Sequence, residues 1–244
     1  MGRLDGKVAM VTGGARGQGE AEVRLFAAEG AHVVVSDVLV DEGQALAREL
    51  GDGVAFARHD VSREEEWAAA IGFTLERFGA LHVLVNNAGI AYGAPIAEHS
   101  LDAYERLVAV NQIGVFLGIR AAIAPMTEAG GGSIVNISSG AGLRATKYLI
   151  GYAATKYAVT GMTAAAALEL ARHRIRVNSI HPGVIDTAMT AGSTPEIMSA
   201  MMKATPLRRV GLPVEIARVA LFLASDESSY MTGAHVPVDG GMTV

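Results

Sequence analysis

Short apolar segments alternate with stretches long enough to form a helix along the whole chain of 244 residues. Most of these segments are rich in β-branched residues and almost continuously apolar, which is typical of strands buried on both faces of a parallel sheet. Seven segments have this character, at 7–12, 32–37, 54–60, 81–86, 133–138, 176–180 and 235–239. The alternation predicts one α/β domain over residues 1–244, with a doubly wound, seven-stranded parallel sheet and helices on both faces.

Local signals predict where some of the helices begin. Ser62 to Glu65 have the pattern of a capping box, which predicts a helix start at that point. Pro213 precedes an apolar segment and suits the first turn of a late helix. Residues 182–207 are the one long stretch with little regular pattern.

Composition excludes several classes of function. The formal net charge is −5 and no run of lysine and arginine stands out, so we expect no nucleic-acid partner and no binding to an anionic membrane. The chain has no cysteine, and its seven histidines form no pair with metal-ligand spacing, so we expect no metal site. We find no signal peptide and no apolar run as long as a membrane span, and we therefore expect a soluble cytoplasmic protein.

A glycine-rich loop follows the first predicted strand and opens a helix. Gly13, Gly17 and Gly19 have the spacing G-x-x-x-G-x-G. Without Cβ atoms the backbone turns sharply and approaches a pyrophosphate, whose charge the helix N-terminus stabilises. The alternative is a glycine-rich turn that binds nothing, and the position between strand and helix favours the phosphate site.

Asp37 ends the second predicted strand, where an acidic residue meets the adenosine ribose hydroxyls of a dinucleotide. Its carboxylate accepts hydrogen bonds from a diol and repels a 2′-phosphate, which favours NAD(H) over NADP(H). Arg16 in the glycine loop favours the opposite choice, but Val38 offers no second cation, and we expect Asp37 to decide. Asp60 and Val61 end the third predicted strand, where an adenine ring could rest.

Tyr152 and Lys156 lie one helical turn apart, a spacing that places their side chains on one face. Lowering the pKa of a tyrosine from about 10 to about 7 requires about 4 kcal/mol. One positive charge about 4 Å away supplies an interaction of that size at an effective dielectric constant near 20. The pair therefore suits general acid/base chemistry, and the alternative is an amphipathic helix with an incidental tyrosine and lysine.

Four motifs in this order strongly resemble the short-chain dehydrogenase/reductase family over nearly the whole chain. They are the glycine loop at 12–19, Asn-Asn-Ala-Gly at 86–89, Asn-Ile-Ser-Ser at 136–139 and Tyr-Ala-Ala-Thr-Lys at 152–156. The resemblance implies a Rossmann fold and an enzyme that interconverts a secondary alcohol and a ketone with NAD(H). One mild departure is Gln18, where the family often has an apolar residue.

The resemblance also implies roles for individual residues. Tyr152 would be the general acid/base, Lys156 would hold the nicotinamide ribose and lower the pKa of Tyr152, Ser139 would bind the substrate oxygen, and Asn111 would hold a water leading to Lys156. Other positions would line the cofactor: Gly13, Arg16, Gly17, Gln18, Gly19, Asp37, Val38, Asp60, Val61, Asn87, Ala88, Gly89, Pro182, Gly183, Val184 and Thr187.

The helix expected from Gly151 to about His173 is apolar nearly all round, so it must be covered both by its own sheet and by something else. The family resemblance implies a homotetramer, with this helix at one interface and the C-terminal strand at another; the alternative is a monomer. Residues 188–207 would form a lid over the substrate, made soft by four methionines at 189, 198, 201 and 202, although these could equally be core residues.

The chain looks most like bacterial hydroxysteroid dehydrogenases of the 3α,20β type and cyclic secondary-alcohol dehydrogenases, in the stretches at 13–19, 37–43, 130–139 and 174–183. We therefore expect a bulky apolar substrate. One alternative is a 3-oxoacyl-carrier-protein reductase, against which Asp37 and the negative net charge argue. Another is an NAD(H)-binding regulator without activity, which would have no need of Tyr152 with Lys156.

Overall fold

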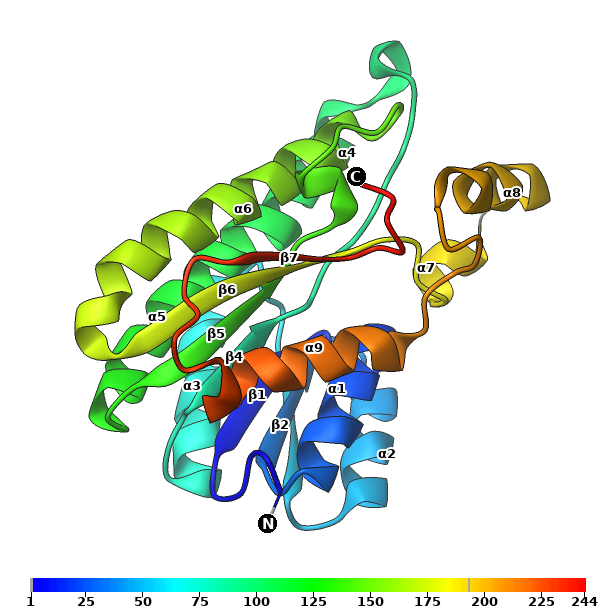
Figure 1. The fold of residues 1–244 in the computed structure, drawn as a ribbon. Helices are drawn as coiled ribbons and strands as arrows, with labels where there is room; N and C mark the ends of the chain where they lie inside the picture. Colours follow the sequence, from blue (N-terminus) through cyan, green and yellow to red (C-terminus); the bar gives the residue numbers. More distant parts are fainter. Residues whose placement is uncertain (1, 193) are drawn as a thin grey trace.

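The computed structural model describes residues 2–192 and 194–244. Across these residues seven parallel strands form one sheet in the order β3-β2-β1-β4-β5-β6-β7 (Figure 1). The strands are β1 Val8–Thr12, β2 His32–Asp37, β3 Val54–Arg58, β4 Val83–Asn86, β5 Gly132–Ile137, β6 Ile175–Pro182 and β7 His235–Val238. The predicted fold class is confirmed, and every predicted strand is present with ends that differ by no more than two residues.

Helices cover both faces of the sheet and enclose two apolar cores. One core is formed with α1 Gly17–Ala28, α2 Val40–Leu50 and α9 Pro213–Ala224, and the other with α3 Glu64–Phe78, α5 Gly114–Glu128 and α6 Ile150–Leu170. The strands β1, β2, β4, β5 and β6 are almost wholly buried, which explains why their sequences lack a polar face, whereas the edge strands β3 and β7 are partly exposed.

Two predictions of helix starts have different outcomes. Pro213 is the first residue of α9, as predicted. The capping box at Ser62 is wrong, because the Ser62 hydroxyl donates a 2.7 Å hydrogen bond to Asp60 Oδ1 instead of capping α3. Glu66 Oε2 accepts the Asp60 N–H at 2.7 Å, so the turn before α3 is closed by a residue in the first turn of the helix.

Residues 101–128 form a continuous helical stretch of α4 Leu101–Leu107, a π-helical turn Val108–Ile113 and α5. By length and mean hydropathy (1.7) this stretch is apolar enough to cross a membrane, although Arg106 and Arg120 interrupt its apolar run. Part of it is buried against the rest of the protein, and the core helix of a soluble protein has the same properties.

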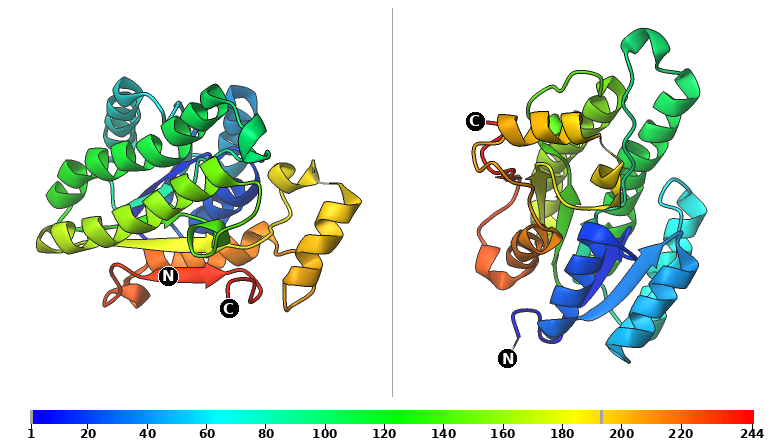
Figure 2. Two further views of the ribbon diagram at one scale, coloured as in Figure 1. Left: turned by 90° about the horizontal axis from the view of Figure 1, so that it is seen from above. Right: turned by 90° about the vertical axis from the view of Figure 1, so that its right-hand side faces the viewer.

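The stretch without a clear pattern contains two helices, α7 Ala188–Ala191 and α8 Pro195–Ala204. Two views show α8 projecting from the body of the molecule (Figures 1 and 2). Among the described residues, α8 contains none that is buried, so its methionines are not core residues. Residue 193, within the predicted lid, lies outside the described residues.

Candidate active site

The predicted site residues gather at the carboxyl ends of the parallel strands. The strand order reverses at β1, which lies between β2 and β4 in the sheet. In open α/β sheets ligands bind at such a switch point. The glycine loop leaves β1 there, and the loops after β4, β5 and β6 converge on it.

The glycine loop has the backbone that its sequence requires. Gly13 and Gly17 have φ of +62° and +61°, a region that side chains with a Cβ rarely adopt. A Cβ on Gly13 would lie 2.8 Å from Ala88 Cα, and one on Gly19 would collide with Gly13 O. The N-terminus of α1 therefore stands open to a ligand, and Arg16, the residue before it, is exposed.

Asp37 ties the glycine loop to the end of β2. It is only 7% exposed, and its two carboxylate oxygens accept hydrogen bonds of 3.0 Å from Ala15 N–H and Leu39 N–H. Each oxygen keeps a further lone pair, because a carboxylate offers about four acceptor sites. Val38 beside it is half exposed. The arrangement leaves an acceptor for hydroxyl groups, and the cation across from it on β3, Arg58, is paired with Glu66.

The loop after β4 is strapped to the end of β1. Asn87 Nδ2 donates hydrogen bonds to Thr12 O (2.9 Å) and Gly13 O (3.0 Å), and Ala88 N–H donates to Thr12 Oγ1. Val61 lines a narrow pocket with Ala88 among its other walls. This places the residues predicted for the adenosine end on one side of the glycine loop.

Three consecutive residues at the carboxyl end of β5 hold α6. Ile137 O accepts a 2.8 Å hydrogen bond from Lys156 Nζ, and Ser138 Oγ donates one of 3.0 Å to Lys156 O. Ser139 follows them and interacts with the Tyr152 phenol. The strand end therefore fixes both members of the tyrosine–lysine pair relative to the sheet.

Burial controls the electrostatics of this pair. Lys156 is 4% exposed, and burial lowers its pKa to about 8, so the ammonium stays mostly charged at neutral pH. Burial raises the pKa of the Tyr152 phenol, and the Ser139 hydroxyl counteracts this effect. The expected lowering of the Tyr152 pKa by Lys156 is not seen in this arrangement, because the ammonium donates to Ile137 O and lies 5.7 Å from the tyrosine ring centroid.

Asn111 lies in the π-helical turn between α4 and α5 and is fully buried. Its Oδ1 accepts the Ile90 N–H at 2.9 Å, and its Nδ2 donates to Ile90 O at 2.8 Å. A Cβ on Gly89 would lie 3.4 Å from Asn111 Oδ1 and 3.6 Å from Lys156 Nζ. Asn111 and Lys156 therefore border the same small volume, which only a glycine leaves open.

The residues after β6 turn back toward the glycine loop. Pro182 ends β6, and a Cβ on Gly183 would lie 2.7 Å from Asp239 Cα, so this turn also requires glycine. Thr187 Cγ2 lies 3.5 Å from the place that a Cβ would take on Gly17. The segment predicted to frame the nicotinamide thus meets the segment predicted to hold the pyrophosphate.

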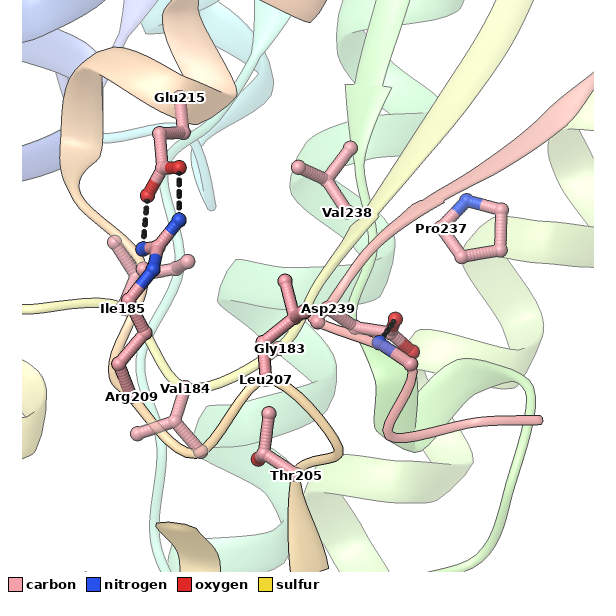
Figure 3. Close-up of a pocket in the computed structure, with 13 residues that line it drawn as sticks. Gly183, Val184, Ile185, Thr205, Leu207, Arg209, Glu215, Pro237, Val238 and Asp239 are labelled. Atoms are coloured by element: carbon pink, nitrogen blue, oxygen red, sulfur yellow. Dashed lines mark hydrogen bonds and ion pairs between the residues drawn. The ribbon is translucent and has the colours of Figure 1, made fainter.

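A pocket of about 260 Å³ lies beside this turn, between the base of the predicted lid and the C-terminal residues (Figure 3). Gly183 and Val184 line it, and the Arg209–Glu215 ion pair borders it. Its lining, drawn from the described residues, includes none of the four predicted catalytic residues. We therefore place the reaction centre at the tyrosine–lysine pair and not in this pocket.

Sequence reasoning gave no role to three buried residues, two beside the site and one on α1. Ser138 was overlooked because Ser139 beside it carries the family pattern. His181 lies within a quoted motif, yet nothing in the motif indicates that its ring contacts the Ser139 carbonyl at 3.0 Å. Glu22 is a fully buried acid on α1, and its spacing from Phe26 on the same face was the available signal.

Comparison with known proteins adds an independent line of support. A family model described as enoyl-(acyl carrier protein) reductase matches residues 13–243. A 3-alpha-(or 20-beta)-hydroxysteroid dehydrogenase of Mycobacterium tuberculosis is 51% identical over 98% of this chain and 90% of its own length. A trans-4-hydroxycyclohexanecarboxylate dehydrogenase of Sinomonas cyclohexanicum is 44% identical over 99% and 94%. The crystal structure of a Brucella melitensis 3-ketoacyl-(acyl-carrier-protein) reductase complexed with NADH superposes with a TM-score of 0.94 at 34% identity, over 99% of this chain and 100% of that one.

Proposed function

Because the chain belongs to the short-chain dehydrogenase/reductase family, we propose that it interconverts a secondary alcohol and a ketone with NAD(H), on a bulky apolar substrate such as a hydroxysteroid or a cyclic alcohol. The family and the alcohol-oxidoreductase class rest on the match over residues 13–243 and on the dehydrogenase relatives. The choice of substrate rests on the names of those relatives. Each name describes a substrate that carries a hydroxyl group on a cyclic carbon skeleton.

The residues present fit a nicotinamide dinucleotide. The loop at Gly13 and Gly17 is a cradle that any Cβ would fill or strain, and Asp37 offers acceptors for the adenosine ribose. When bound, the nicotinamide accepts or supplies the hydride. Arg16 would reach a 2′-phosphate, but the carboxylate of Asp37 would repel it, which supports the preference for NAD(H).

Three side chains supply the proton chemistry. In the oxidation direction, Tyr152 takes the proton of the substrate alcohol while Ser139 donates a hydrogen bond to the same oxygen. The charged Lys156 lies 5.7 Å from the tyrosine ring centroid, where its positive charge would favour the phenolate form of Tyr152 against the burial that raises its pKa.

The observation that carries this proposal is the pair of hydrogen bonds between the end of β5 and Lys156 on α6. They hold the buried Lys156 beside Tyr152 and Ser139. A protein that only binds the dinucleotide has no use for a buried ammonium beside a phenol. The NADH-bound reductase with a TM-score of 0.94 supports a carrier-linked substrate as a second candidate.

The test is NADH formation from NAD⁺ with a panel of alcohols: hydroxysteroids, cyclic and open-chain secondary alcohols, and a 3-hydroxyacyl thioester. Preference for hydroxysteroids or cyclic alcohols would support the proposal. Turnover of the thioester alone would move the enzyme to acyl-chain metabolism. Tight NADH binding with no turnover across the panel would support the regulator and overturn the proposal.

We also propose that the chain is a cytoplasmic homotetramer. Leu168 on α6 is 85% exposed, and Phe116 and Tyr157 on the neighbouring helices α5 and α6 are 49% and 44% exposed, so an apolar face stands ready for a second copy. The edge strand β7 would make the second interface. Light scattering would give the mass, and a monomer at micromolar concentration would refute the assembly. Cell fractionation would test the location.

A further inference from the structure

A hydrogen-bonded chain of buried side chains leads away from the carbonyl group of Ser139. His181 on β6 is fully buried, and its Nδ1 lies 3.0 Å from Ser139 O. Its Nε2 lies 2.9 Å from Ser179 Oγ, which lies 2.9 Å from Nδ1 of His235. The chain thus joins the reaction centre to the edge strand β7, which pairs with β6 (Figure 1).

The direction of each hydrogen bond follows from what each atom can do. Burial lowers the pKa of His181 to about 4, so the ring is neutral at physiological pH and carries one N–H. A carbonyl oxygen only accepts, so this N–H is on Nδ1 and points at Ser139 O. Ser179 must then donate its single proton to His181 Nε2. Its longer contact with Ala234 O, at 3.4 Å, cannot use the same proton as well.

His235 completes the chain as a donor. Because the Ser179 proton is committed to His181, His235 Nδ1 donates its own hydrogen to Ser179 Oγ. The exposed edge residue thereby fixes the rotamer of Ser179, and Ser179 fixes the tautomer of His181. Such outer partners commonly orient a group that touches substrate.

The hydrogen-bonded chain ends at Ser139, whose side chain and backbone carbonyl both accept hydrogen bonds. Ser139 Oγ accepts a 3.1 Å hydrogen bond from Ala141 N–H, and its carbonyl accepts two, from Gly142 N–H at 2.8 Å and from His181 at 3.0 Å. With both acceptors fixed, the hydroxyl hydrogen is left to the Tyr152 side of the residue. We propose that His181 is a positioning residue for Ser139, because its Nδ1–H fixes the backbone from which the serine hydroxyl meets the substrate oxygen. This inference rests on the proposed function.

Two isosteric variants separate the two hydrogen bonds of His181. In His181→Asn the amide nitrogen takes the place of Nδ1 and can still donate to Ser139 O. In His181→Gln the amide takes the place of Nε2, stays near Ser179 and leaves Ser139 O with the Gly142 N–H as its donor but without the one from β6. We expect His181→Gln to lower kcat about 10- to 100-fold with an unchanged NADH dissociation constant, and His181→Asn to stay within about 3-fold of wild type. Ser179→Ala, which keeps the imidazole, should lower kcat less than His181→Gln.

A double-mutant cycle with Ser139→Ala shows whether His181 acts through the serine. In that background the hydroxyl is gone, so His181→Gln should change the residual rate by less than about 3-fold. A second readout needs no substrate. Nitrogen-15 NMR of histidine-labelled protein should find His181, identified by its loss in His181→Gln, as a neutral ring protonated at Nδ1. Ser179→Ala should weaken this preference.

Several outcomes would overturn the inference. They are wild-type kcat in His181→Gln, equal losses in His181→Asn and His181→Gln, an undiminished effect of His181→Gln without the Ser139 hydroxyl, or a His181 ring protonated at Nε2. In each case an active wild type leaves the proposed function standing. A wild type that binds NADH but oxidises no alcohol of the panel would overturn the proposed function and this inference with it.

Discussion

Replacing Glu22 by glutamine should stabilise the protein at neutral pH. Glu22 is fully buried on α1, and within the described part of the chain neither carboxyl oxygen has a hydrogen-bond partner. Burial raises its pKa from 4.5 to about 8, so the folded protein holds a proton that the unfolded chain releases above pH 4.5. Stability therefore falls as pH rises from about 4.5 to about 8, because the folded state binds more protons in that window.

The size of the effect follows from the width of that window. From pH 4.5 to pH 7 the cost of keeping Glu22 protonated is about 3 kcal/mol, at about 1.4 kcal/mol for each pH unit. Glutamine keeps the shape and carries no such proton, so Glu22→Gln should gain up to about 3 kcal/mol at pH 7 and almost nothing at pH 4.5.

Urea unfolding at fixed protein concentration measures this difference, with the single tryptophan as the probe. Trp67 is 2% exposed, so its fluorescence reports the loss of the core. Glu76→Gln, at an exposed position of α3, is the matched control and should show no pH-dependent gain. A gain from Glu22→Gln that is zero at pH 7, or equal at pH 5 and pH 7, would refute the reasoning.

Four further predictions concern the site. Tyr152→Phe should lower kcat at least about 100-fold and leave NADH binding intact, as measured by fluorescence titration; near-normal turnover would remove Tyr152 as the acid/base. Asp37→Ala should lower the ratio of kcat/KM for NAD⁺ over NADP⁺ about 10-fold or more, and an unchanged ratio would exclude Asp37 from the ribose site. Gly19→Ala should weaken NADH binding because the new methyl group collides with Gly13 O, which calorimetry would detect. Burial lowers the pKa of Lys156 to about 8, so Lys156 should lose its charge above about pH 8 and no longer favour the Tyr152 phenolate. In alkaline ultraviolet difference spectra, Tyr152 should therefore ionise at a higher pH than it would beside a lysine that stayed charged.

The fold could be predicted from sequence because burial on both faces of a parallel sheet leaves a continuous signal. The segment His32–Asp37 has three consecutive valines at 33–35 and is buried from Val33 on, and its observed ends match the predicted ones. The ends of helices were harder to predict from sequence, because the side chain of a capping residue can form a hydrogen bond with another nearby group in place of the helix N–H groups. At Ser62 the hydroxyl found a carboxylate two residues earlier, a choice that depends on the turn after β3 and not on the motif.

Those site residues that belong to a sequence motif could be predicted. Tyr152, Lys156 and Asp37 carry spacing that a reader of the sequence can interpret. The acceptor of the Lys156 ammonium could not be foreseen, because Ile137 contributes a backbone carbonyl that every residue possesses. His181 was missed for a similar reason, since its partner is the carbonyl oxygen of Ser139 and pairing of β6 with β5 brings the two together.

The exposed helix α8 has a consequence for how this chain can change. It contributes no buried side chain among the described residues, so local unfolding of α8 costs little of the free energy that holds the sheet and α6 together. Substitutions and insertions there fall outside the cooperative folding unit, whereas the reacting groups lie inside it. Under the predicted role of residues 188–207 as a lid, changes in this surface segment would alter which alcohol is bound while the buried reaction centre stays the same.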